Sequence, residues 1–272
     1  MAIKLWYQSM SRQAVWGSYS TRLRAILDQV RHPDTEIECH GITKIGGVAD
    51  QYRYLEYLET GEVMENIHQA IERKFDAFLI GNIADPGIRE CREIADMPVL
   101  GLCETALHVA CMMGANFGLV TINEKFTPRI VENVVRYGLK DRLKSVNRMQ
   151  MDRILDLDAA FNDETAKNAV VGQFQAAAKV VTDAGAEVVI PAGGVAMALL
   201  AQAGVYQTPS GAPILNGITT LVKMGEMAVA LSRIMGGTFT SKRLQYAPPG
   251  PEQIAEIRKY YGAHIYPTVK DV

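Results

Sequence analysis

The chain has 272 residues, of which 48% are hydrophobic and 21% are charged. This balance is typical of a globular protein with a sizeable core and excludes the disordered and fibrous classes. The 28 Lys and Arg residues nearly match the 30 Asp and Glu residues, so the formal net charge is only -2. Because the charges are scattered and form no basic stripe, we expect no nucleic-acid partner.

The compartment is predicted from three further features of the sequence. The first ten residues mix Lys4 and Gln8 with apolar residues, so they lack the continuous apolar segment of a signal peptide. The long uncharged stretch 188–222 is broken by several prolines and glycines, and no membrane-spanning helix fits in it. The four cysteines form no CxxC pair, which favours reduced thiols over a disulfide framework or a zinc site. We therefore expect a cytoplasmic protein with no membrane segment and no metal.

Short apolar runs alternate with helical stretches along the chain. The expected strands are residues 3–7, 37–42, 77–80, 99–102, 118–122, 187–190 and 214–215. Most of them are followed by a loop and then by apolar residues at the helical period. This alternation is typical of parallel α/β construction.

The chain also contains a weak internal repeat. The strand ending at Ile80 and the strand ending at Ile190 are each followed by a turn, a proline-led strand and a helix. The strand at 3–7 and its following helix have a counterpart in the strand at 118–122 and its helix, at a similar offset. We infer an α/β fold of two pseudo-symmetric parallel-sheet lobes with a cleft between them. The first lobe takes residues 1–112 plus 222–272, the latter including a C-terminal extension, and the second takes residues 113–221.

The loops after matching strands are expected to line that cleft, because active sites of open parallel sheets lie at the carboxyl ends of the strands. The first such loop carries Tyr7, Ser9 and Ser11, and its counterpart carries Thr121. These hydroxyl groups can hold a carboxylate or an amide of a ligand. They can equally cap helices, and the sequence leaves both interpretations open.

Two turns at corresponding positions are candidates for binding an anion. Asp85 is the expected N-cap of a helix that has Pro86 at its first position. Backbone N–H groups at such a turn can also receive a carboxylate or an enolate oxygen. The residues expected to present these groups are Asn82 and Ile83 in the first turn and Ala192, Gly193 and Gly194 in the second. This pair of turns predicts a small carboxylate or carbonyl substrate.

Glu104 begins the helix that follows the strand at 99–102, close to the predicted cleft. An acidic residue in the first turn favours the helix dipole, which is the structural interpretation. The alternative is a catalytic role. The neighbouring Cys103 is interpreted as a small buried residue, since the Glu104 carboxylate opposes ionisation of its thiol.

Several motifs occur together in one order: Asp85-Pro86-Gly87, the stretch 98–108 that contains Glu104, residues 117–121, and residues 188–194. As a set they resemble the hydantoin racemase branch of the aspartate/glutamate racemase superfamily, over about residues 3–235. The resemblance implies two pseudo-symmetric lobes, a substrate in the cleft, no organic cofactor or metal, and a homo-oligomer.

The resemblance also identifies a departure from the family. Family members have one cysteine three residues before Asp-Pro-Gly and a second one in the turn of the second lobe, and each works on one face of the substrate carbon. These positions correspond here to Asn82 and Ala192. Neither an amide nor a methyl group takes up a proton near neutral pH. The sequence therefore argues against racemisation by two thiols.

We expect a cofactor-independent isomerase, racemase-like, that acts at a carbon next to a carbonyl or carboxylate of a small metabolite, a carboxylate or a cyclic amide or lactone. Glu104 is the preferred acid–base group, because it matches the family's Gly-x-x-Glu-Ala type of position and because burial can raise its pKa. The predicted catalytic residues are Glu104, Asn82 and Asp85, and the predicted binding residues are Tyr7, Ser9, Ser11, Ile83, Thr121, Ala192, Gly193, Gly194 and Tyr206. Two alternatives stay open: a hydrolase or lyase that uses Glu104 and a bound water, and a catalytically silent binding protein.

Overall fold

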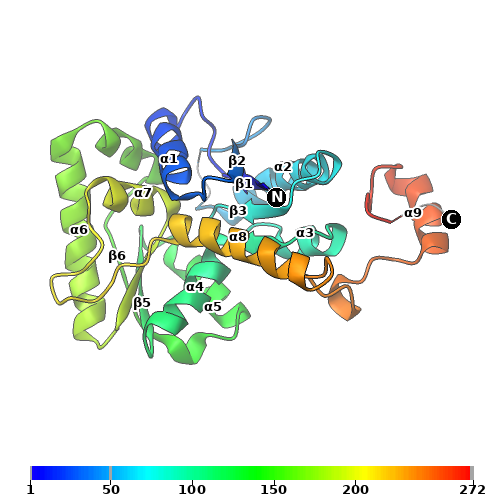
Figure 1. Cartoon of the computed structure of the whole chain (residues 1–272). Coiled ribbons are helices and arrows are strands. Elements are labelled where there is room, and N and C mark those ends of the chain that lie inside the picture. Colours follow the sequence, from blue (N-terminus) through cyan, green and yellow to red (C-terminus); the bar gives the residue numbers. More distant parts are fainter. Residues whose placement is uncertain (1, 49–50, 270–272) are drawn as a thin grey trace.

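The strands form two separate parallel sheets in the computed structural model, which describes residues 2–48 and 51–269. The first sheet has the order β2 (Thr35–His40), β1 (Ile3–Gln8), β3 (Ala77–Ile80), β4 (Val99–Gly101). The second sheet has the order β6 (Leu143–Arg148), β5 (Phe117–Thr121), β7 (Val188–Ala192). The prediction of an α/β fold with two parallel-sheet lobes is thus confirmed (Figure 1).

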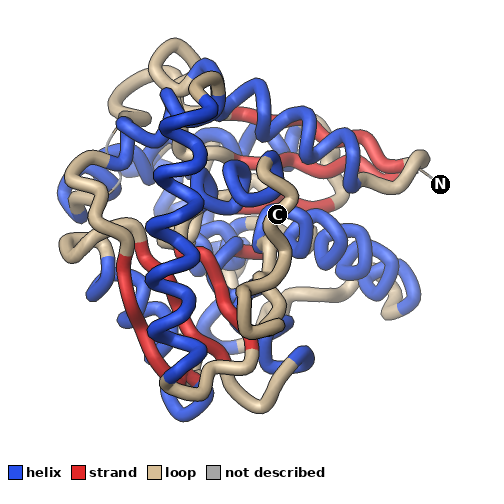
Figure 2. The backbone as a smooth tube through the Cα atoms, turned by 90° about the vertical axis from the view of Figure 1, so that its left-hand side faces the viewer, coloured by secondary structure: helices blue, strands red, loops and turns tan. Residues whose placement is uncertain are grey.

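The helices follow the strands in alternation. Up to the second sheet they are α1 (Gly17–Val30), α2 (Arg53–Glu72), α3 (Ile88–Ile94) and α4 (Leu102–Met113). Those of the second lobe are α5 (Thr127–Arg136), α6 (Glu164–Asp183) and α7 (Gly194–Gln202), followed by α8 (Gly217–Ile234) and α9 (Pro251–Tyr261). Figure 2 shows the two groups of strands apart from each other, with the long helix α6 over one of them.

Strand β1 shows how the first sheet divides the core. Successive side chains of a strand point to opposite faces. Leu5 and Tyr7 therefore belong to the large apolar cluster that continues into the second lobe, whereas Trp6 belongs to a smaller cluster under α2 and α3. All three side chains are fully buried, as expected for a parallel sheet covered on both faces.

The last part of the chain packs mainly on elements around the first sheet. Helix α8 packs on α1, α4 and β3. Beyond it, Lys242 donates hydrogen bonds to the carbonyl oxygens of Arg92 and Glu93 on α3, and the Tyr266 hydroxyl donates to the Glu93 carboxylate at 2.7 Å. Helix α9 lies at the end of the molecule remote from α6 in Figure 1. The proposed lobe boundaries stay a prediction, and their outermost ends, residues 1 and 272, lie outside the described residues.

The structure corrects three local predictions. Residues 214–215 form no strand, because Ile214 makes only an isolated bridge to Val189. Strand β6 was not expected, since this edge strand is only partly buried and its sequence is largely polar. The prediction that Asp85 caps its own helix is wrong: α3 begins at Ile88, after Gly87 as its N-cap.

A membrane-crossing helix was not expected, and in the parts of the chain that the structure describes no helix combines the length and the apolar character that a membrane span needs.

Candidate active site

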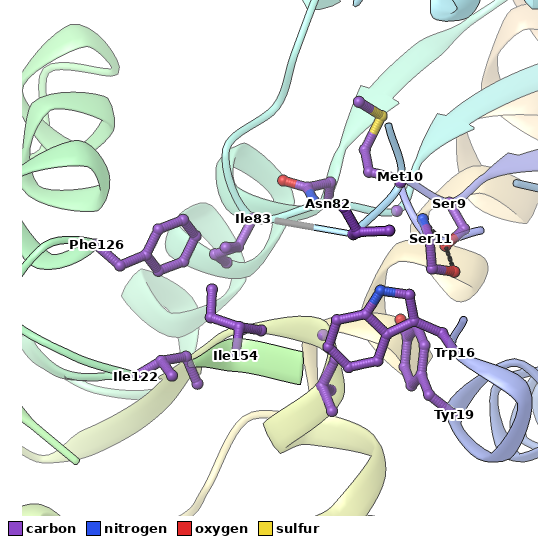
Figure 3. A pocket seen from close by; sticks show the side chains of 16 residues that line it. Ser9, Met10, Ser11, Trp16, Tyr19, Asn82, Ile83, Ile122, Phe126 and Ile154 are labelled. Atoms are coloured by element: carbon purple, nitrogen blue, oxygen red, sulfur yellow. Dashed lines mark hydrogen bonds between the residues drawn. The ribbon is translucent and has the colours of Figure 1, made fainter. Parts of the chain in front are cut away.

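A narrow cavity of about 50 Å³ lies between the two lobes, at the carboxyl ends of β1, β3, β5 and β7. Both lobes contribute to its wall (Figure 3). The lining residues are Ser9, Met10, Ser11, Trp16, Tyr19, Gly47, Val48, Gly81, Asn82, Ile83, Ile122, Phe126, Ile154, Gly193, Gly194 and Val195. None of these described residues carries a charged side chain. The size of the cavity suits a small ligand.

Six of the residues predicted for the site lie in this lining. They are Ser9, Ser11, Asn82, Ile83, Gly193 and Gly194. Five of them lie in loops that follow strands and Gly194 is the first residue of α7, so all six lie near the carboxyl ends of strands, where the cleft was expected. Their assigned roles stay predictions.

The polar groups of the lining are partly engaged with one another. The Ser9 and Ser11 hydroxyl groups share a hydrogen bond of 2.7 Å. Asn82 Oδ1 accepts the backbone N–H of Ala84 at 2.8 Å, and the Gly193 N–H donates to the carbonyl oxygen of Pro191 at 3.0 Å. The turn of the second lobe therefore offers a ligand the first N–H groups of α7, starting at Gly194, which have no acceptor within the helix.

Reasoning from the sequence missed the aromatic part of the cleft. Trp16 and Tyr19 stand at the start of α1 with their rings in an edge-to-face arrangement, 6.0 Å between centroids, and Phe126 faces them from the second lobe. No motif marks these residues. Only their position could have indicated them: each lies in the first turn of a helix, or in the loop before it, and that helix follows a strand whose end lines the cleft.

Four predicted binding residues do not line the cavity. Tyr7 and Ala192 are fully buried behind the turns. The Thr121 hydroxyl is hydrogen-bonded to Thr127 at 2.5 Å, and the side chain of Tyr206 is 57% exposed on the surface.

Glu104 does not face the cavity either. Its carboxylate forms a bidentate ion pair with the Arg92 guanidinium of α3, with one N–O distance of 3.1 Å. Both side chains are largely buried. This pair fastens the first turn of α4 to α3, which is a structural role.

Asp85 lies behind the cleft, where it caps α4 from outside that helix. Its carboxylate oxygens accept the backbone N–H groups of Cys103 at 2.9 Å and Glu104 at 2.8 Å, and the Tyr137 hydroxyl at 2.7 Å. A Cβ built on Gly101 would lie about 2.5 Å from the Asp85 carboxyl group, so only glycine allows this approach. Burial raises the pKa of Asp85 to about 7, although the three hydrogen bonds act in the opposite direction.

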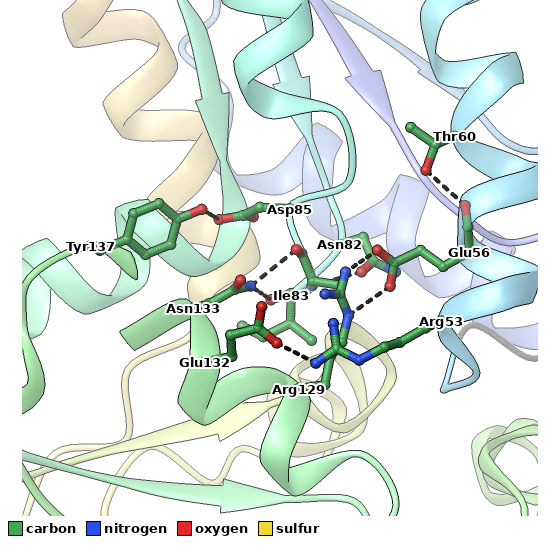
Figure 4. A network of polar contacts seen from close by, with 11 residues as sticks. Arg53, Glu56, Thr60, Asn82, Ile83, Asp85, Arg129, Glu132, Asn133 and Tyr137 are labelled. Atoms are coloured by element: carbon green, nitrogen blue, oxygen red, sulfur yellow. Dashed lines mark hydrogen bonds and ion pairs between the residues drawn. The ribbon is translucent and has the colours of Figure 1, made fainter. Parts of the chain in front are cut away.

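Helix α5 of the second lobe holds the turn that carries Asn82 (Figure 4). The Asn133 side chain donates to the carbonyl oxygens of Ile83 at 3.4 Å and Ala84 at 3.0 Å. One turn earlier, Arg129 forms a buried bidentate ion pair with Glu56 of α2. These contacts cross from one lobe to the other, so they fix the width of the cleft.

A metal site was not expected, and among residues 2–48 and 51–269 no three His, Cys, Asp or Glu side chains lie together in a group that could hold an ion.

Fold and cleft together define a class: a two-lobed parallel α/β protein with a cavity between its lobes. Residues 18–225 match the family described as Asp/Glu/Hydantoin racemase, and the chain belongs to this family. The resemblance found in the sequence is confirmed. The protein is accordingly a racemase-like enzyme of the isomerase class, and its family acts on small molecules.

Curated relatives and solved structures agree with this assignment. The chain is 30% identical over 220 residues to hydantoin racemase from Pseudomonas sp. (strain NS671), covering 81% of this chain and 80% of the relative. It is 28% identical over 224 residues to hydantoin racemase from Rhizobium meliloti, covering 81% and 85%. Allantoin racemase from Klebsiella pneumoniae has the same fold, with a TM-score of 0.73 at 22% identity over 91% of this chain and 94% of that one.

The buried ion pair between the lobes gives a first testable prediction. Arg129→Met leaves the Glu56 carboxylate buried without its partner, and we expect the free energy of unfolding to fall by about 3–5 kcal/mol. Replacing both residues by methionine should recover most of this loss, because a buried pair and an apolar pair of similar volume are nearly equivalent. Urea denaturation monitored by circular dichroism measures both changes.

The matched control is Arg148→Met, which removes an exposed pair with Glu124 in the second lobe and should cost less than about 1 kcal/mol. Equal losses at Arg129 and Arg148 would contradict a special contribution of the interlobe pair.

Asp85 gives a prediction for the pH dependence of stability. Its pKa is about 7 in the folded chain against an ordinary value of 3.8, so between these values the folded state keeps a proton that the unfolded state releases. Stability relative to the Asp85→Asn variant should therefore fall as the pH rises from about 4 to about 7, by at most about 4 kcal/mol, and then level off. Urea denaturation of both proteins between pH 4 and pH 8 measures the difference. A difference that stays constant or grows with pH would show that the carboxyl group is ionised throughout.

Proposed function

We propose that this enzyme binds a small neutral cyclic amide and acts at the ring carbon next to a carbonyl group, without an organic cofactor and by a route other than two-thiol racemisation. The observation that carries the proposal is the lining of the cleft, in which the described residues are polar or apolar but uncharged.

An uncharged lining discriminates between the two kinds of substrate that the family name covers. An amino acid or dicarboxylate would leave its charges in a narrow cavity without a cationic side chain among the described lining residues, which is costly. A cyclic amide has alternating N–H and C=O groups. Ser9, Ser11 and Asn82 can pair with such groups without any charge.

The relatives support this choice of substrate class. Their names refer to hydantoin and allantoin, both of which contain a ring of amide groups. The apolar side of the cleft, with Trp16, Phe126 and Ile154, offers a surface to the flat ring or its substituent.

The cleft also contains groups suited to an enolate intermediate. When a proton leaves the carbon next to a carbonyl group, negative charge develops on the carbonyl oxygen. The N–H groups that start α7 point toward the carboxyl end of the second sheet, and they can receive that oxygen. Enolate stabilisation is common to isomerases and lyases, so it does not decide between these two classes. The alternative of a hydrolase or lyase that uses Glu104 loses its support, because Glu104 is paired with Arg92 outside the cavity.

The family resemblance extends the proposal to the setting of the enzyme. We propose that it works in the cytoplasm and as a homo-oligomer. The substitution of both family thiols, by Asn82 and Ala192, favours one alternative: a member that still binds the ligand but no longer turns it over.

Ligand selectivity tests the proposed substrate class. Allantoin or a 5-substituted hydantoin at millimolar concentration should raise the melting temperature, because a ligand that binds only the folded state stabilises it by mass action, whereas glutamate and aspartate should not. Gly193→Val should abolish this shift. A side chain at 193 enters the cavity, with its Cβ 3.0 Å from Ile122.

The control for steric change is Gly172→Val on α6, where an added Cβ meets no atom within 4 Å. This variant should keep the full thermal shift. A shift with glutamate but not with the cyclic amides would contradict the proposed substrate class.

Turnover is tested by exchange in heavy water. We expect deuterium to replace the proton on the ring carbon next to the carbonyl group of a 5-substituted hydantoin or of allantoin. The loss of this proton's signal in nuclear magnetic resonance measures the exchange rate. The rate measured without enzyme is subtracted. Binding without exchange on either compound would identify the silent binding protein instead.

A further inference from the structure

Tyr19 is distinguished by chemistry among the described residues that line the cleft. The other side chains there are aliphatic, aromatic, hydroxyl, thioether or amide groups, none of which gains or loses a proton in the working range of an enzyme. A tyrosine hydroxyl has an ordinary pKa of about 10 and serves as an acid or base in enzymes. Asn82 and Gly193 cannot replace it in this role.

The position of Tyr19 is set by contacts with the second lobe. Its backbone N–H donates to the Asp158 carboxylate at 2.8 Å, and the neighbouring Ser18 N–H donates to the same carboxylate at 3.4 Å. Asp158 belongs to the short 3-10 helix Ile154–Phe161 of the second lobe. The side chain itself is buried and packs edge-to-face on Trp16. Tyr19 is therefore held at the border between the lobes.

The hydroxyl group of Tyr19 lies where the two turns meet. It is 3.0 Å from the point that a Cβ of Gly194 would occupy, and the carbonyl oxygen of Gly81 is 3.9 Å from the same point. The hydroxyl thus lies against the turn of the second lobe and close to the turn that carries Asn82 (Figure 3). These are the two turns between which the substrate carbon is expected.

We propose that Tyr19 is the catalytic residue that moves the proton of the substrate carbon, a role that rests on the proposed function. The Tyr19 hydroxyl first releases its proton to solvent. The phenolate oxygen then takes the proton from the carbon next to the carbonyl group, and the electron pair of the broken C–H bond moves to the carbonyl oxygen as an enolate. Returning a proton from the hydroxyl to the carbon restores the neutral ring and the phenolate.

Tyr7 supports this assignment from behind the cleft. Its hydroxyl is completely buried and has no hydrogen-bond partner among the described residues. Burial and then the nearby Tyr19 raise the pKa of Tyr7 well above its usual range. Tyr7 therefore stays a neutral phenol, and of these two hydroxyl groups only that of Tyr19 is placed to take up a proton in the cavity.

The test compares Tyr19→Phe with the intact full-length chain in the deuterium exchange of allantoin and a 5-substituted hydantoin. We expect exchange to fall at least ~100-fold, while the thermal shift caused by the ligand is kept. In the unmutated chain the exchange rate should rise about tenfold per pH unit below the pKa of Tyr19, and this dependence should vanish in the variant. The matched control is Tyr260→Phe on α9, where the side chain is 81% exposed, and it should exchange as the unmutated chain does.

Two results separate this role from the proposed function. If the unmutated chain exchanges the ring proton and Tyr19→Phe does so at the same rate, the role of Tyr19 is overturned and the proposed function stays intact. No exchange by the unmutated chain on either compound overturns the proposed enzymatic function and the role of Tyr19 with it.

Discussion

The arrangement of the cleft depends on the carboxyl group of Asp85, which joins three parts of the chain that are distant in sequence. It closes the start of α4, where β4 runs into the helix with no loop between them, and it receives the hydroxyl group of Tyr137 from the second lobe. Gly101 leaves room for it. Because Asp85 belongs to the turn that begins at Gly81, it connects the turn that carries Asn82 to α4 and, through Tyr137 at the end of α5, to the second lobe.

A second layer of contacts makes the two lobes one unit at this edge. Arg129 is buried against Glu56, and Asn133 satisfies the carbonyl oxygens of the same turn. Buried charges of this kind contribute little net stability compared with apolar packing, but they are costly to separate. They therefore resist opening of the lobes and specify their distance. At this distance the lobes leave between them a narrow cavity of about 50 Å³, a size that suits a small ligand.

The sequence was sufficient for the architecture, which depends on the hydrophobic period, and for the place of several lining residues, which depends on strand ends. Ser9, Asn82 and Gly193 lie where strands finish, and parallel strands bring their ends to one edge. The direction of a helical side chain is harder to predict. Glu104 starts the expected helix, yet its carboxylate faces Arg92, a partner that only the packing of α3 reveals. Tyr19 was missed for the converse reason, since nothing local shows that the first turn of α1 faces the second lobe.

The described residues that line the cleft carry no charged side chain, which changes the demands on the base. A thiol has an ordinary pKa near 8.5 and a phenol near 10, so at pH 7 only about one phenol in a thousand is ionised. The phenolate is the stronger base, which suits a carbon acid activated by a single ring carbonyl rather than by neighbouring charges. However, only a small fraction of the enzyme carries the phenolate at neutral pH. This loss of rate is offset only if the N–H groups at the start of α7 stabilise the enolate as it forms. The replacement of both thiols, which the sequence predicts, is thus compatible with chemistry in this cleft, provided that Tyr19 and the turn beside Gly194 act on the same substrate atoms.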